Sequence, residues 1–72
     1  MVRRKRRYIL IDTYCSKELC KKLNVYLIEN DKDYAIVRCY LSDLEHIKEI
    51  LKRENITIRS ISGTLKSLRE RL

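Results

Sequence analysis

The sequence has no proline, no tryptophan and no phenylalanine, and it contains one glycine in 72 residues. No linker, repeat or low-complexity stretch divides it, and a chain of this length makes one domain. No apolar run approaches the roughly 18 residues needed to span a membrane, and the basic N-terminus lacks the apolar stretch of a signal peptide. We therefore expect one small cytoplasmic domain, with a marginal core because a chain this short buries only about 60% of its unfolded surface.

The cysteines are too few for a disulfide framework or a structural zinc site. Cys15, Cys20 and Cys39 form an odd set without C-x-x-C spacing, and the single histidine, His46, has no cysteine near it. A metal carrier of the fold proposed below would need paired cysteines after the first strand, and the C-x4-C spacing does not provide them. We expect buried or half-buried free thiols in a reducing compartment.

Charge is the strongest signal in the composition. The formal net charge is +7, and most of the excess comes from five consecutive cations: Arg3, Arg4, Lys5, Arg6 and Arg7. Lys66, Arg69 and Arg71 form a second basic cluster near the other end. Concentrated positive charge indicates a polyanion partner, either nucleic acid or an anionic membrane surface, and the alternative is a solvated tail. We assign residues 1–7 to a basic arm and residues 8–72 to a single α+β domain.

The pattern of apolar residues predicts the element order. Strands are expected at 7–13, 24–31, 33–41 and 56–62, and helices at 16–23, 42–55 and from 64 onward. Ser16 can cap the first helix, and Ser42 with Glu45 forms an S-x-x-E capping box for the second. The order β-α-β-β-α-β, followed by a short C-terminal helix, predicts a ferredoxin-like or RNA-recognition-like α+β fold. In that fold one antiparallel sheet carries two helices on one face.

Alternation along the strands predicts two different faces for this sheet. The face toward the helices is expected to carry Ala35, Val37, Cys39, Leu41, Ile56, Ile58 and Ser60. The other face is expected to carry Ile36, Arg38, Tyr40, Thr57, Arg59 and Ile61. This second set is neither a core nor a solvent surface, so another element or a partner should cover it.

The tyrosines offer only a weak sign of base stacking. Tyr40 could stack on a base, but a tyrosine that fills a strand is the commoner case, and the RNA-recognition signature is absent. Tyr8, Tyr14 and Tyr26 can join the same face only if the strand register allows it. We therefore do not expect the sheet to be the main RNA platform.

The single glycine, Gly63, lies between Ser62 and Thr64 just before the last helix. Glycine is needed where φ is positive or where the backbone approaches something closely. We expect Gly63 to turn the chain and Thr64 to cap the helix, with the following N–H groups and Lys66 facing a phosphate. The alternative is that Gly63 makes only the turn and the helix packs on the open sheet face.

Three short segments resemble a known family. They are Arg7-Tyr8-Ile9, Ile36-Val37-Arg38-Cys39 and Ser62-Gly63-Thr64-Leu65 before a basic end. In this order they resemble protein component 2 of archaeal ribonuclease P and its eukaryotic counterpart. Members of that family are usually longer, both after the first strand and at the C-terminal end.

The resemblance implies a protein subunit of the ribonucleoprotein endonuclease that removes the 5′ leader of precursor tRNA. The RNA would carry the chemistry and need Mg²⁺, and the partners would be ribonuclease P RNA, precursor tRNA and protein component 3. From the residues themselves, we find no paired carboxylates, no Ser/His or Cys/His pair and no phosphate loop, so we expect no catalytic residue and no bound cofactor. Asp31 and Asp33 are expected to be turn residues rather than metal ligands.

The expected RNA-binding residues come from the arm, the sheet and the C-terminal turn. They are Arg3, Arg4, Lys5, Arg6, Arg7, Arg38, Arg59, Ser62, Gly63, Thr64, Lys66, Arg69 and Arg71. Two other functions stay open at this point. One is a ferredoxin-like RNA- or DNA-binding protein of another ribonucleoprotein, and the other is a protein-interaction domain whose sheet face forms a self-dimer.

Overall fold

The computed structural model describes residues 5–70, and within this range the chain is an α+β domain with one four-stranded antiparallel sheet and three α-helices. The strands are β1 (Arg6–Ile11), β2 (Tyr26–Asn30), β3 (Ala35–Tyr40) and β4 (Ile58–Ser62). The helices are α1 (Lys17–Leu23), α2 (Leu44–Arg53) and α3 (Leu65–Arg69), and a 3₁₀ turn, η1 (Leu41–Asp43), precedes α2.

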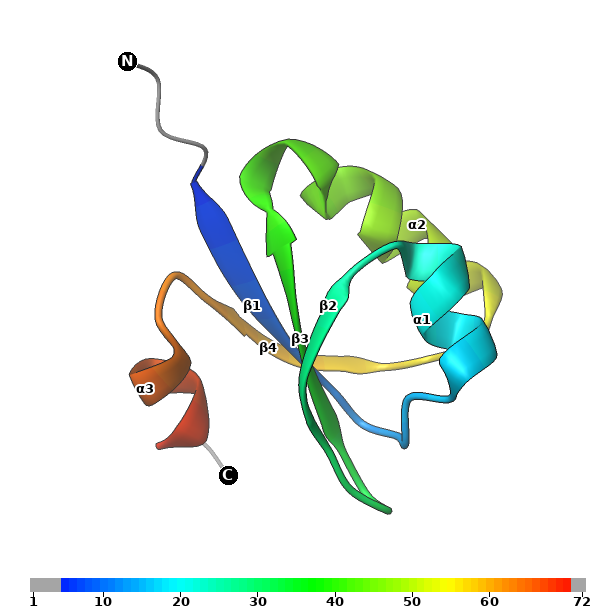
Figure 1. Ribbon diagram of the computed structural model, residues 1–72, viewed down its shortest axis with the longest axis horizontal. Coiled ribbons are helices and arrows are strands. Elements are labelled where there is room, and N and C mark those ends of the chain that lie inside the picture. The colour runs from blue at the N-terminus through cyan, green and yellow to red at the C-terminus, as the bar shows by residue number, and fades with distance from the viewer. Residues whose placement is uncertain (1–4, 71–72) are drawn as a thin grey trace.

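The sheet has the strand order β2-β3-β1-β4, and each neighbouring pair is antiparallel. Helices α1 and α2 lie on one face of the sheet, and α3 lies on the other (Figure 1). The expected element order and the α+β class are confirmed, and the arrangement is compatible with a small ferredoxin-like fold.

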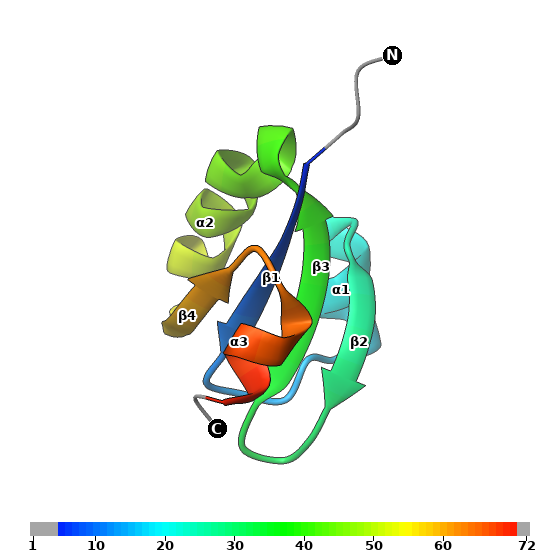
Figure 2. The same cartoon turned by 90° about the vertical axis from the view of Figure 1, so that its left-hand side faces the viewer.

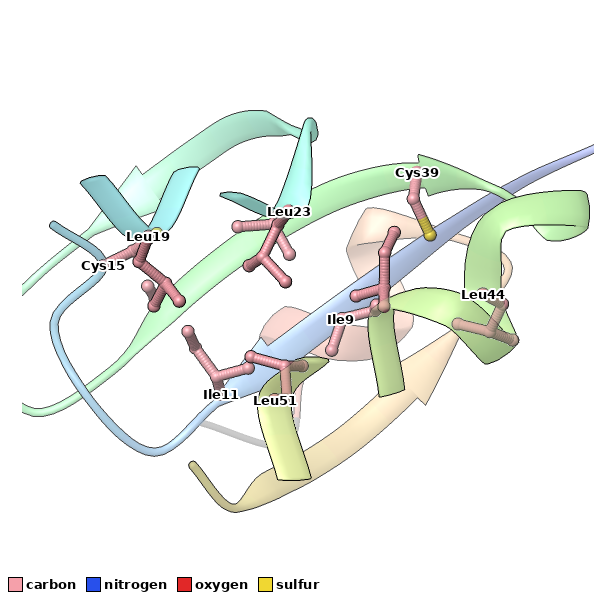
Figure 3. Packing of buried hydrophobic residues seen from close by; sticks show 11 residues of the cluster. Ile9, Ile11, Cys15, Leu19, Leu23, Cys39, Leu44 and Leu51 are labelled. Carbon is pink, nitrogen blue, oxygen red and sulfur yellow. The ribbon is translucent and has the colours of Figure 1, made fainter. Parts of the chain in front are cut away.

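The larger core lies between the sheet and the two helices α1 and α2 (Figure 3). It is built from alternate residues of the central strands and from the inward faces of the helices: Ile9, Ile11, Ala35, Val37, Cys39, Leu19, Leu23, Leu44, Ile47 and Leu51. Fully burying a Val, Leu or Ile side chain contributes about 1.5–3 kcal/mol, so this layer supplies most of the favourable free energy of apolar burial. The predicted facing of β3 is confirmed from Ala35 to Cys39.

A smaller core lies on the opposite face, beneath α3. Leu68 is fully buried against Leu10 of β1 and Ile36 of β3, and Tyr8 and Tyr34 pack at its edge. A helix of five residues is too short to be stable alone, so its contact with the sheet must hold it. The expectation that another element covers this half-apolar face is therefore confirmed for the part under α3.

The predicted capping box at the start of α2 does not form. Ser42 lies inside η1, and α2 begins at Leu44 after Asp43, whose side chain makes no capping hydrogen bond. An N-cap residue needs an extended backbone, and Ser42 cannot adopt one because it lies within the 3₁₀ turn η1. Leu41 also leaves the strand here and is exposed rather than facing the helices as expected. Ser16 and Thr64 cap α1 and α3 as predicted.

Alternation also fails in β4, where the pairing with β1 shifts between Leu10 and Ile11. An extra residue in one strand reverses the facing of everything beyond it. Ile58 and Ile61 both pack against the helix-side core, although we expected Ile61 on the other face. Ser60, expected toward the helices, instead lies opposite Leu10, which belongs to the smaller core.

Candidate nucleic-acid interface

Part of the sheet face that carries α3 is left uncovered, near the start of β1 (Figure 2). There four residues lie opposite one another across all four strands: Tyr26 of β2, Arg38 of β3, Tyr8 of β1 and Ser62 of β4. Directly opposed residues of antiparallel strands point to the same face, with their Cβ atoms about 5 Å apart. We call these four residues the Tyr–Arg row.

The Tyr–Arg row contains a stacked cation. The Arg38 guanidinium carbon lies 4.7 Å from the centroid of the Tyr26 ring. Tyr26 is 61% exposed, because β2 is an edge strand and begins at this residue. A guanidinium is planar and carries its N–H donors in its own plane, so one that lies over a ring can still meet a phosphate or a base edge. The row therefore combines an aromatic surface with a directional cation.

A hollow of about 180 Å³ adjoins the row at the start of β2. At this point the last two residues of β3 continue beyond this end of β2. Its walls combine two arginines, two tyrosines, one acid and two further residues: Arg6, Arg38, Tyr26, Tyr40, Asp43, Asn24 and Cys39. Whole small-molecule sites occupy about 300–1,000 Å³, so this hollow suits one planar group. Bases stack on tyrosine, and guanidinium groups bind phosphate, so an unpaired nucleotide matches its chemistry.

The basic arm predicted for residues 1–7 is partly strand. Arg6 and Arg7 belong to β1, and the Lys5 carbonyl accepts a hydrogen bond from the Leu41 N–H at 2.7 Å. The pairing of β1 with β3 therefore extends to the limit of the described residues. Arg3 and Arg4, the remaining cations of the predicted arm, lie outside them, as does Arg71.

Gly63 does not have the conformation that we expected of it. Its φ is not positive, and a Cβ placed on it would have Arg7 Nη1 as its nearest neighbour at 3.6 Å, an ordinary contact. In the described part of the chain the left-handed conformation is adopted by two asparagines, Asn24 (φ 53°) and Asn55 (φ 58°). Each follows a helix, where asparagine can replace glycine in the αL cap. The sequence signal was an asparagine directly after the first helical pattern and another as the last residue of the second.

At the C-terminal end of α2, Asn55 occupies the position that glycine usually takes in a helix cap. The Ile56 N–H donates to the Leu51 carbonyl at 2.9 Å, and the Asn55 N–H donates to the Lys52 carbonyl at 3.1 Å. These are the two hydrogen bonds of a Schellman motif. Asparagine, instead of glycine, therefore terminates both α1 and α2.

The turn before α3 satisfies two of its own N–H groups. The Thr64 N–H donates to Ser62 Oγ at 3.3 Å, and the Ser67 N–H donates to Thr64 Oγ1 at 3.3 Å. The predicted cap by Thr64 is confirmed, but these two N–H groups, which we had expected to face a phosphate, bond within the turn.

Four of the predicted cations divide into two groups. Arg6 and Arg38 meet at the hollow. Arg59 instead lies beside Asp12, with Nε 3.9 Å from Oδ1, and Arg69 lies beside Glu29, with Nε 3.9 Å from Oε2. These acids offset part of the positive charge at both positions. The bulge also removes the strict alternation that grouped Arg59 with Arg38.

Cys39 lines the hollow, and its thiol is held neutral by a raised pKa. Burial raises its pKa, the nearby Asp43 carboxylate raises it further, and the Arg7 charge lowers it. Such a thiol is a poor nucleophile at neutral pH. The hollow is therefore suited to binding rather than to covalent chemistry.

Residues 5–70 contain neither a metal-binding cluster nor a membrane-spanning helix. No group of three or more His, Cys, Asp or Glu side chains is placed to hold a metal ion in this range. None of the helices in the same range has the length and apolar character needed to cross a membrane.

Residues of this interface that sequence reasoning left undecided are Tyr8 and Tyr26. Each lies opposite Arg38. The face of the sheet to which their side chains point depends on how neighbouring strands pair, and the sequence of a single strand does not reveal that pairing. Tyr14, the third undecided tyrosine, lies near α1 in a separate groove.

Comparison of the chain with protein-family models, curated proteins and solved structures finds no match.

Proposed function

We propose that this chain is an RNA-binding subunit of a cytoplasmic ribonuclease P, built on a ferredoxin-like fold. The observation that carries the proposal is the convergence of the three segments that resemble the family. In the Tyr–Arg row, Tyr8 from the first lies directly opposite both Arg38 from the second and Ser62 from the third. Segments separated by more than twenty residues therefore contribute neighbouring side chains to one surface.

The chemistry of that surface suits RNA better than a folded protein partner. Single-stranded RNA is bound by aromatic rings that stack on bases and by cations that contact the backbone. Tyr26, Tyr40, Arg6 and Arg38 supply both kinds of contact around one hollow. In this proposal the RNA subunit hydrolyses precursor tRNA with its own Mg²⁺, and the protein supports it together with protein component 3.

The first test is a pull-down of the tagged full-length chain from its native extract, with sequencing of the RNA and identification of co-purifying proteins. The proposal expects one structured RNA together with other ribonuclease P proteins. The captured assembly should also remove the 5′ leader from precursor tRNA when Mg²⁺ is supplied. Recovery of mixed RNA, or of a defined RNA without leader removal, would contradict it.

A variant pair controls for non-specific capture. The double variant Tyr26→Ala with Arg38→Gln should recover much less RNA than the wild type. Arg53→Gln, on the exposed end of α2 across the sheet, should recover as much. Equal loss in both variants would indicate capture by overall charge.

A further inference from the structure

A second groove, of about 400 Å³, lies beside α1, away from the Tyr–Arg row. Two cysteines, two lysines and two large apolar side chains line it: Cys15, Cys20, Lys17, Lys21, Tyr14 and Leu27. Tyr14 is 56% exposed and belongs to neither core. None of these residues belongs to the candidate nucleic-acid interface.

The two thiols are in direct contact within this groove. Cys15 Sγ lies 2.9 Å from Cys20 Sγ, and both cysteines are free. A disulfide bond is about 2.05 Å long. Two thiolates that share a tetrahedral zinc ion lie about 3.8 Å apart, given Zn–S distances of about 2.3 Å. The observed spacing is too close for a shared metal and favours direct bond formation between the sulfurs.

Hydrogen bonds hold each cysteine on a fixed element. The side chain of Asn30, the last residue of β2, forms two hydrogen bonds with the Cys15 backbone. Asn30 Oδ1 accepts from the Cys15 N–H, and Asn30 Nδ2 donates to the Cys15 carbonyl, both at 2.9 Å. Cys20 lies in α1, whose start is fixed by the Ser16 hydroxyl, which accepts from the Leu19 N–H. Two reacting groups held in contact react far faster than free groups, because the entropy of bringing them together is already lost.

We propose that Cys15 and Cys20 form a thiol-modification site, at which a low-molecular-weight acidic disulfide oxidises the pair to an intramolecular disulfide. The inference does not depend on the proposed RNA function.

The reaction proceeds in two exchanges. The Cys20 thiolate attacks one sulfur of the reagent, forms a mixed disulfide and releases the first reagent thiolate. Cys15 then loses its proton to solvent, attacks the Cys20 sulfur and releases the second. Two protein thiols are oxidised, one reagent disulfide is reduced, and two reagent thiols leave.

The two cysteines are suited to different steps. Cys15 is 2% exposed, whereas Cys20 is half-buried, so a reagent in the groove meets Cys20 first. Burial and the contact with Cys20 raise the pKa of the Cys15 thiol to about 12, so Cys15 stays protonated during the first attack. Its later attack is favoured because the mixed disulfide forms in contact with it.

The lysines define the reagent that the groove prefers. Lys17 and Lys21 are four residues apart on α1, so they lie on one side of the helix at the groove. They attract carboxylates, while Tyr14 and Leu27 provide an apolar wall. Oxidised glutathione, an acidic disulfide, fits this combination, and the cationic disulfide cystamine does not.

The test treats the full-length protein with oxidised glutathione at neutral pH without oxygen and follows intact mass and peptide linkage. The wild type should lose two hydrogens, with Cys15 joined to Cys20 and Cys39 still reduced. Cys15→Ser should stop at a mixed disulfide on Cys20, and Cys20→Ser should stay unmodified. A bond that includes Cys39, or no oxidation of a folded wild type, would overturn the proposal.

Charge variants test the preference for an acidic reagent. Lys17→Gln with Lys21→Gln should slow oxidation by glutathione disulfide several-fold at low ionic strength and leave the cystamine rate unchanged or raised. Lys48→Gln with Lys52→Gln, on α2, removes the same charge and should have little effect. Equal slowing in the two double variants would refute the role of the groove, because overall charge would then explain the rate.

Discussion

Replacing Arg38 by glutamine is the sharpest test of the candidate interface. Arg38 is central to the Tyr–Arg row and also lines the hollow, so its loss should remove one phosphate contact. Each neutralised phosphate contributes about 0.7–0.9 to the slope of log affinity against log salt. With 1 M salt as the reference, losing one contact lowers affinity about sixfold at about 0.1 M. The slope itself should fall by about 0.8.

The measurement is fluorescence anisotropy of a labelled oligouridylate, and of the RNA recovered by the tagged protein, over a series of salt concentrations. Arg38→Lys keeps the charge but loses the planar guanidinium over the Tyr26 ring, so it should keep the slope and lose affinity mainly through geometry. The two variants therefore separate the charge of Arg38 from its shape.

Arg53→Gln is the matched control, because it also changes the net charge from +7 to +6. Arg53 ends α2, on the other side of the sheet from the row. If Arg53→Gln lowers the slope as much as Arg38→Gln, RNA senses only the overall field of the protein. An unchanged slope in Arg38→Gln would likewise refute the assignment of the row.

Three further outcomes follow from the packing. Leu68→Ala should destabilise the fold by about 2–5 kcal/mol in urea unfolding, because Leu68 is fully buried and α3 cannot stay folded without it; a loss below about 1 kcal/mol would contradict its anchoring role. Gly63→Ala should keep or raise stability, by up to about 1 kcal/mol, because φ and space both permit a Cβ; a clear drop in the melting temperature would show that glycine is required. Because burial raises the pKa of folded Cys15 from 9.0 to about 12, its stabilisation is complete below pH 9 and is lost as pH rises toward 12. Between pH 8 and pH 10 the wild type should therefore lose on the order of 1 kcal/mol more than Cys15→Ala, and parallel pH profiles would argue against a buried thiol.

Several features of this protein could be derived from the sequence alone, because they depend on neighbours along the chain. Strand and helix order, the caps by Ser16 and Thr64, and the facing of Ala35, Val37 and Cys39 all follow from periodicity or from bonds over a few residues. Where a local rule met a tertiary constraint, it failed. Ser42 lost its capping role because the chain turns tightly out of β3, and Ile61 changed face because of one bulge.

The candidate site illustrates the same division. The sequence determined that Arg38 and Tyr40 lie two residues apart in β3 and therefore on one face, and that positive charge is concentrated near the N-terminus. Only the tertiary structure decided that Tyr26 and Tyr8 lie opposite Arg38, that α3 covers one part of the sheet and leaves another open, and that Cys15 touches Cys20. The physical reason is that register and docking are set by contacts between residues distant in sequence, which compete with one another until the whole core is packed.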